Sequence, residues 1–191
     1  MMIMISTSFL FSFTIFFMLI FSSFSQTYSK PHNIIQETCK KSAESTPNLT
    51  YKFCVTSLES DRRSRSANLH KLGLISIDLL RHNVTSTRRE IKKLLRNKKM
   101  EEFIKGCLKD CVELYSDAVP TLKEAKREYK NRNYKDSNIK VSSIMEAPTT
   151  CENGFKEKEG IVSPLTNNNS NVFQLAALTL SIINMNLHDI Q

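Results

Sequence analysis

The sequence predicts an all-α fold, an up-and-down four-helix bundle with an N-terminal helical hairpin. Apolar residues recur every three or four positions through most of the chain, and no run alternates polar with apolar residues as a half-buried strand would. The 191 residues include only 4 glycines and 5 prolines, so long helices meet few breaks. Four long segments with an apolar stripe bury it best against one another, which is the arrangement of a bundle.

The first 25 residues predict a secretory signal peptide. They carry no charge, the stretch Phe9–Phe21 is almost wholly apolar, and Ser23 and Ser25 are small residues at the spacing that signal peptidase accepts before Gln26. The alternative is a membrane anchor, because the apolar run is barely long enough to span a bilayer. No basic cluster follows directly, which favours export and leaves residues 26–191 as one domain.

The stretch His32–Ser60 predicts the hairpin. Two short apolar strips are separated by a turn at Ser45–Asn48, where a proline and an asparagine suit a turn and a helix start. Helices this short are marginal alone. A bridge between Cys39 and Cys54 would tie them together and stabilise the fold by roughly 3 kcal/mol.

The first two bundle helices are expected at Ala67–Arg96 and at about Phe103–Tyr129. Ser66 is a plausible N-cap for the first, and its middle, His82–Thr87, is poor helix material in which we expect a bend or a frayed turn. The second keeps its apolar phase on both sides of Pro120, which predicts a single kinked helix, with Asn97 as the cap of its start.

A third helix is expected from Asp136 or Ser137 to Phe155, interrupted at Pro148. A loop, 156–171, then leads to a last helix at about Val172–Leu187. This last segment is apolar nearly all round, so the other helices should bury it on most faces.

All five cysteines lie in the exported part of the chain. An oxidising compartment favours pairing, but the odd count leaves one thiol over, and two bridges can be arranged in 15 ways that spacing alone does not separate. The same compartment agrees with three N-glycosylation sequons, at Asn48, Asn83 and Asn168.

The net charge of +8 favours anionic partners, such as an acidic polysaccharide, an anionic membrane or an acidic protein face. The export signal and the lack of any nucleic-acid-binding module argue against nucleic acid. The basic residues can be ordinary solvated helix faces or an anion-seeking patch, for which the second cluster is the best candidate. The three clusters are Arg62, Arg63 and Arg65; Arg88, Arg89, Lys92, Lys93, Arg96, Lys98 and Lys99; and Lys123, Lys126, Arg127, Lys130, Arg132 and Lys135.

No catalytic constellation is recognisable in the sequence. Nucleophile-elbow, zinc-protease, phosphate-loop and EF-hand patterns are missing, so we expect no catalytic residue, metal or cofactor. Cys107 and Cys111, one helical turn apart, could imitate a redox or metal site but have no second pair or nearby histidine. The four histidines share no metal-ligand spacing; they are His32, His70, His82 and His188.

Four motifs in order resemble the plant invertase/pectin methylesterase inhibitor family. They are CLKDCVELYSDAV (Cys107–Val119), APTTCENGF (Ala147–Phe155), SPLT (Ser163–Thr166) and FQLAALTLSII (Phe173–Ile183), and with the hairpin the resemblance covers about 32–187. It implies a four-helix bundle after a hairpin, with disulfides Cys39–Cys54 and Cys111–Cys151. Cys107 is then the free thiol, either buried as a small hydrophobe or competing for Cys151.

The resemblance also implies a function. Members inhibit acid invertases or pectin methylesterases by forming a complex over the active-site cleft. We expect this chain to be secreted to the cell wall (apoplast) and not to the vacuole. Some invertase inhibitors carry a Pro-Lys-Phe tripeptide that this chain lacks, which weakens the invertase assignment without establishing the other. A carrier of a small apolar ligand, and a member that has lost inhibition, are the alternatives.

Overall fold

The computed structural model describes residues 33–188, and within them every regular element is a helix. The predicted all-α fold is confirmed. The signal peptide expected at 1–25, its cleavage site and His32 lie outside the described residues. The elements are α2 (Ile34–Ser45), α3 (Tyr51–Glu59), the 3-10 turn η1 (Arg62–Ser66), α4 (Leu69–Leu94), α5 (Glu102–Lys130), α6 (Tyr134–Ile144), α7 (Glu146–Lys156) and α8 (Thr166–His188).

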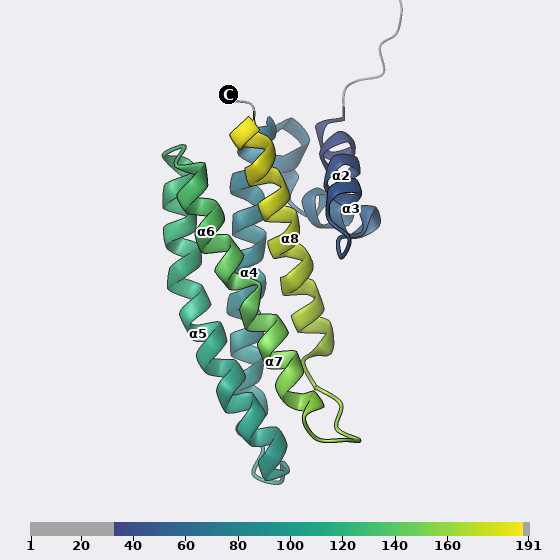
Figure 1. Ribbon diagram of the computed structural model, residues 1–191, viewed down its shortest axis with the longest axis vertical. Helices are drawn as coiled ribbons and strands as arrows, with labels where there is room; N and C mark the ends of the chain where they lie inside the picture. The colour runs from purple at the N-terminus through teal and green to yellow at the C-terminus, as the bar shows by residue number, and fades with distance from the viewer. Residues whose placement is uncertain (1–32, 189–191) are drawn as a thin grey trace, which may run out of the picture. The chain divides into compact units, whose positions relative to one another are not determined.

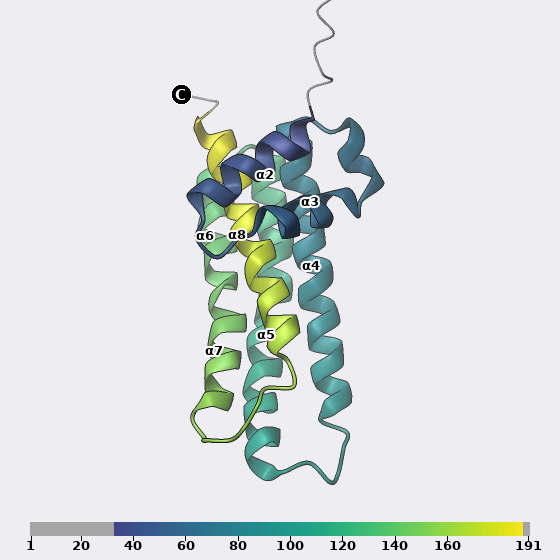
Figure 2. The same cartoon turned by 90° about the vertical axis from the view of Figure 1, so that its right-hand side faces the viewer.

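Four antiparallel legs form the bundle (Figures 1 and 2). Helices α4 and α5 are the first two, α6 and α7 follow one another as the third, and α8 runs back as the fourth. Helix α8 packs on α4, α6, α7 and the hairpin, and it is buried on most faces as its composition predicts. Among the described residues, no helix is both long and apolar enough to cross a membrane.

The hairpin of α2 and α3 packs on one end of α8 and α4 (Figure 2). Apolar side chains from all four helices make a separate small core there, in which Leu58, Leu72 and Leu178 are fully buried. The Ser181 hydroxyl donates to the Ser42 hydroxyl oxygen at 2.9 Å, which pairs polar groups that the contact buries. Short helices gain their stability from such packing, because alone they are below the length that is stable in water.

Several predicted helix boundaries were wrong. Asn68, not Ser66, caps α4 by accepting from the Lys71 amide at 2.9 Å. The bend expected at 82–87 is missing, since α4 runs through it with Val84 and Thr87 buried, and tertiary burial outweighs weak helix propensity. Asn97 does not cap α5, which starts at Glu102; its side chain accepts from the Lys99 amide in the connecting turn.

The third and fourth legs also differ from expectation. Helix α6 begins at Tyr134, and the interruption falls at Met145, three residues before Pro148. Proline is tolerated in the first turn of α7 because amides there have no intrahelical partner. The expected loop at 156–171 is shorter, because α8 already begins at Thr166. The expected single helix through Pro120 is confirmed.

Gly73 permits a close approach of α4 to α5. A Cβ atom at this position would lie 1.8 Å from the Tyr129 hydroxyl oxygen, and the Tyr129 ring is fully buried. Only a residue without a side chain allows the two helices to meet here.

Candidate functional site

Two disulfides hold the described fold. Cys39–Cys54 joins α2 to α3, and Cys111–Cys151 joins α5 to α7, with Cα atoms 5.5 and 4.9 Å apart. These pairs agree with the pairs that the family resemblance implies, and Cys107 is the cysteine without a bridge.

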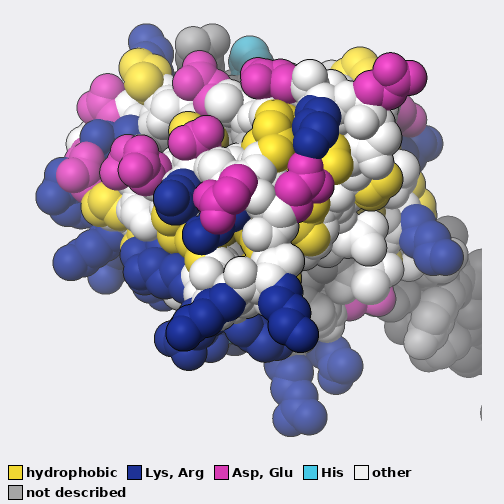
Figure 3. All heavy atoms as spheres, turned by 90° about the horizontal axis from the view of Figure 1, so that it is seen from below, with side chains coloured by type: hydrophobic (Ala, Val, Ile, Leu, Met, Phe, Trp, Pro, Cys, Tyr) yellow, Lys and Arg dark blue, Asp and Glu magenta, His cyan; other side chains and the backbone are white. Residues whose placement is uncertain are grey.

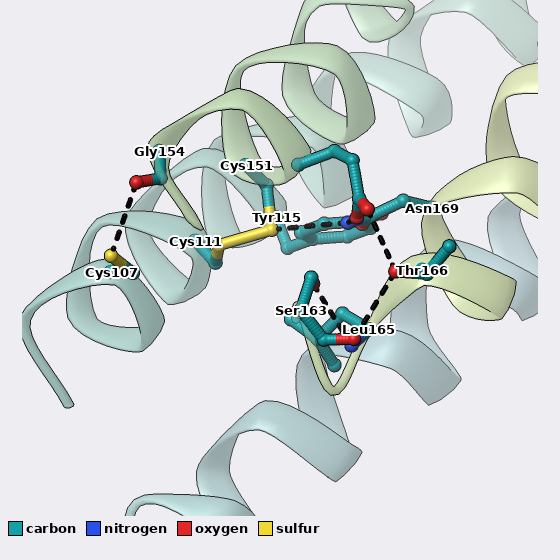
Figure 4. The surroundings of a disulfide bond; sticks show 10 residues. Cys107, Cys111, Tyr115, Cys151, Gly154, Ser163, Leu165, Thr166 and Asn169 are labelled. Carbon is teal, nitrogen blue, oxygen red and sulfur yellow. Dashed lines mark hydrogen bonds between the residues drawn. A yellow bond between two sulfur atoms is a disulfide. The ribbon is translucent and has the colours of Figure 1, made fainter. Parts of the chain in front are cut away.

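Cys107 is a buried thiol one turn before Cys111. Its Sγ donates to the Gly154 carbonyl oxygen of α7 at 3.5 Å, on the same side of α5 as the disulfide (Figure 4). Burial raises the pKa of the Cys107 thiol, and the nearby carboxylates of Asp110 and Glu157 raise the pKa further. A thiol kept protonated is a poor nucleophile, which opposes a redox role.

A buried polar network lies beside the Cys111–Cys151 disulfide (Figure 4). The Tyr115 hydroxyl donates to Asn169 Oδ1 at 2.8 Å, and Asn169 Nδ2 donates to Glu152 Oε2 at 2.7 Å. The Thr166 hydroxyl donates to the other carboxylate oxygen of Glu152, also at 2.7 Å. Burial, and then the charge of Glu152, raises the pKa of Tyr115. The network joins α5, α7 and α8 and keeps its buried polar groups paired.

The sequence does not predict this network, because it indicates a loop at 156–171, where the structure already begins α8 at Thr166. Asn169 lies three residues before Val172 and seven before Ala176, on the face of α8 that both residues bury. Extending the helical phase backwards would therefore have placed Asn169 in the interior.

Two surface grooves lie along α8. One, of about 450 Å³, runs between α7 and α8, with Glu152, Asn169 and Phe173 in its lining and Asn48 of the hairpin turn beside them. The other, of about 530 Å³, lies between the end of α2 and α8, with Met145 and Leu180 in its lining. In the first groove the Glu152 carboxylate already accepts from the Thr166 hydroxyl and from Asn169 Nδ2, each at 2.7 Å.

The described histidines are dispersed. His70 faces the end of α5, His82 is exposed on α4, and His188 ends α8. No group of three His, Cys, Asp or Glu residues among the described residues could hold a metal ion.

His70 is expected to make the stability of the fold depend on pH. Its Nδ1 lies 2.8 Å from the Tyr134 hydroxyl and its ring stacks on Tyr129 at 5.0 Å between ring centres. Burial, helped by the positive charge of Arg132, lowers the pKa of His70 below 6.5. The unfolded chain then takes up the proton first as the pH falls, so folding should lose stability below about pH 6.5.

We expect His70→Gln to reduce the loss of stability between pH 7 and pH 5 seen in urea denaturation. His82→Gln, an exposed histidine on the same helix, is the matched control and should leave that loss unchanged. An equal loss in wild type and His70→Gln would contradict the assignment.

The three sequons differ in accessibility. Asn48 is exposed in the hairpin turn, whereas Asn83 is half-buried in α4 and its Nδ2 donates to the Leu79 carbonyl oxygen at 3.0 Å. Asn168 is half-buried in the first turn of α8. Glycosylation stays a prediction at all three, and the geometry favours Asn48.

The described residues form a disulfide-stapled helical bundle with two surface grooves along α8. The sequence model of the plant invertase/pectin methylesterase inhibitor family matches residues 33–182. The chain belongs to this family. Its members are inhibitors, and the chain is therefore classed with inhibitors and not with enzymes.

Relatives named as invertase inhibitors and relatives named as pectinesterase inhibitors are both similar to the chain. A "Putative invertase inhibitor" of Platanus acerifolia is 42% identical over 78% of this chain and 83% of the relative. "Pectinesterase inhibitor 12" of Arabidopsis thaliana is 33% identical over 88% and 96%. A crystal structure of a mutant pectin methylesterase inhibitor from Arabidopsis superposes with a TM-score of 0.66 at 26% identity, covering 77% of this chain and 93% of that one.

Proposed function

We propose that this chain is a secreted protein inhibitor of a plant acid invertase or pectin methylesterase, which acts in the cell wall by forming a one-to-one complex over the active site of the enzyme. The observation that carries the proposal is the continuous family match over 33–182 on a bundle of the same fold. A "Cell wall / vacuolar inhibitor of fructosidase 2" of Arabidopsis thaliana, 31% identical, agrees with a wall or vacuolar setting. The comparisons do not favour a carrier of an apolar ligand.

Two observations bear on the choice of enzyme and point in opposite directions. The relative with 42% identity is named for invertase, whereas the relative with 33% identity is named for pectinesterase. The chain lacks the Pro-Lys-Phe tripeptide, which weighs against the invertase mode. The enzyme must therefore be chosen by measurement.

The oxidised protein should abolish the activity of one enzyme class at mildly acidic pH, with the end point near one inhibitor per enzyme. We would titrate it, purified from the medium of plant cells expressing the full chain, against several isoforms of cell-wall invertase and of pectin methylesterase. Reduced and alkylated protein is the control, since it has the same composition without the staples. Full activity of every isoform at a tenfold excess of inhibitor would exclude the proposal.

A further inference from the structure

A cationic patch covers the end of α4 and the turn that follows it. Within twelve residues the chain carries seven Lys or Arg and a single acid, Glu90, so this stretch has a net charge of +6 in a chain of +8. Figure 3 looks onto this end of the bundle and shows Lys and Arg crowded along one half of it, whereas most Asp and Glu lie on the other half, interspersed with further Lys and Arg. The patch consists of Arg88, Arg89, Lys92, Lys93, Arg96, Lys98 and Lys99, all exposed except the half-buried Arg88.

The patch differs from the two other basic clusters of the chain in its close ion pairs. Each of those clusters has at least one close pair with a carboxylate, although they also hold residues without an ion-pair partner among residues 33–188, which are Arg62, Arg65, Lys123, Lys130, Arg132 and Lys135. Arg63 pairs with Asp61 at 2.6 Å, and in the cluster on α5 Lys126 pairs with Asp78 at 2.5 Å. In the patch, Lys93 has a long contact of 3.7 Å with Glu90. Its six other members have no ion-pair partner among residues 33–188, so their charges are left for an external partner.

The fold holds these charges in place. The turn after α4 is closed by backbone hydrogen bonds, from the Arg96 amide to the Lys93 carbonyl at 3.2 Å and from the Asn97 amide to the Leu94 carbonyl at 3.0 Å. Leu94 and Leu95 pack against the bundle core between the charged residues. A partner therefore meets cations whose backbone is already ordered, which reduces the entropy lost on binding.

The shape of the patch indicates a polymer as the partner. Neither of the two grooves along α8 is lined by a patch residue. The charges follow the last turns of α4 and continue past its end, as a row. The negative end of the helix dipole favours Lys92 and Lys93 without any partner, but Lys98 and Lys99 lie beyond its last turn.

A bilayer fits the patch less well than a polysaccharide does. Binding at a membrane surface uses apolar side chains that enter the interface as well as basic residues. The exposed large apolar side chains of residues 33–188 are Tyr51, Ile139 and Val162, and none of them belongs to the patch.

We propose that the patch binds a linear acidic polysaccharide whose charges are carboxylates, as in pectin from which the methyl esters have been removed. The choice of this polymer rests on the proposed export to the cell wall, where hydrolysis of a pectin methyl ester leaves a carboxylate on the chain. The patch would then concentrate the inhibitor on wall polymer that an esterase has already acted on.

The oxidised full chain should co-sediment with polygalacturonate at pH 6 and low salt, and should release it as salt screens the charges. Highly methyl-esterified pectin of equal length should not retain it. The triple variant Lys92→Gln, Lys98→Gln and Lys99→Gln should bind polygalacturonate at least about tenfold more weakly, since each basic residue near an anionic surface contributes about fivefold.

The matched control is Lys123→Gln, Lys130→Gln and Lys135→Gln. These lysines are equally exposed, have no ion-pair partner among the described residues, and change the net charge by the same amount. We expect this triple to weaken binding less than about threefold. Equal losses in both triples would show that net charge, not the patch, is responsible, and binding to anionic phospholipid vesicles but not to polygalacturonate would assign the patch to membranes. The measurement uses no enzyme, so a failed inhibition assay leaves its outcome unaffected.

Discussion

Replacing Cys151 with alanine is expected to lower the free energy of unfolding by about 4 kcal/mol. The Cys111–Cys151 disulfide closes a 40-residue separation between two legs of the bundle, so its loss returns much conformational freedom to the unfolded chain. Cys151 is a better position to change than Cys111, because Cys107 lies one turn from Cys111 and could take over its partner. Urea denaturation at pH 7 of the oxidised wild type and variant measures the difference.

Two companion variants make the result specific. Cys39→Ala opens the shorter separation of 15 residues in the hairpin and should lower stability by about 3 kcal/mol. Cys107→Ala removes a small buried side chain with no bridge, and should lower stability by less than about 1.5 kcal/mol. A loss in Cys107→Ala as large as the loss in Cys151→Ala would show that Cys107, not Cys111, is the partner of Cys151.

Helical phase explains why so much of the bundle could be predicted. The apolar stripe of α5 continues through Pro120, and the structure buries that stripe from Leu108 to Tyr129 along one unbroken helix. Phase depends only on the residues of the helix itself, and so it is readable from one sequence.

The helix boundaries that were predicted wrongly depend on features of the fold that the helical phase does not contain. Arg132 adopts a left-handed backbone, with φ of 64°, where the turn after α5 would favour glycine. The amides of Arg132 and Asn133 donate to the carbonyls of Tyr129 and Glu128 at 3.0 and 2.9 Å, which closes the end of the helix. No glycine marks this turn in the sequence. For this reason the predicted start of the third helix, at Asp136 or Ser137, falls after the observed start of α6 at Tyr134.

The ion pairs of the basic clusters could not be predicted from the sequence either. Three basic runs look alike in the sequence, yet Lys126 of one run pairs with Asp78, 48 residues earlier, only because α4 and α5 pack together. Which basic residues remain free for a partner is a property of the fold and not of the composition.

Asn169→Ala is expected to lower the free energy of unfolding by about 3 kcal/mol, a large effect for one polar side chain. Asn169 is 3% exposed and is both the acceptor for the Tyr115 hydroxyl and a donor to Glu152. Its removal leaves a buried hydroxyl without a partner and takes a hydrogen bond from a half-buried carboxylate. Urea denaturation at pH 7 again gives the measurement, with Asn184→Ala as the control on the same helix. Asn184 is exposed, its side chain only accepts from Asn138 at the surface, and its loss should change stability by less than about 0.5 kcal/mol.

A double-mutant cycle tests whether the loss comes from the network or only from the cavity. The single variants of the cycle are Tyr115→Phe, which removes the hydroxyl that donates to Asn169, and Asn169→Leu, which removes the amide. The double variant replaces both polar groups by apolar ones of similar size. If the network is responsible, the pair should be more stable than the sum of the single changes by about 1 kcal/mol or more, because no hydroxyl is then left unpaired. Additive losses would mean that Tyr115 and Asn169 are only neighbours in the core. The stability of the contact between α5, α7 and α8 would then depend on the disulfide beside them and on apolar packing.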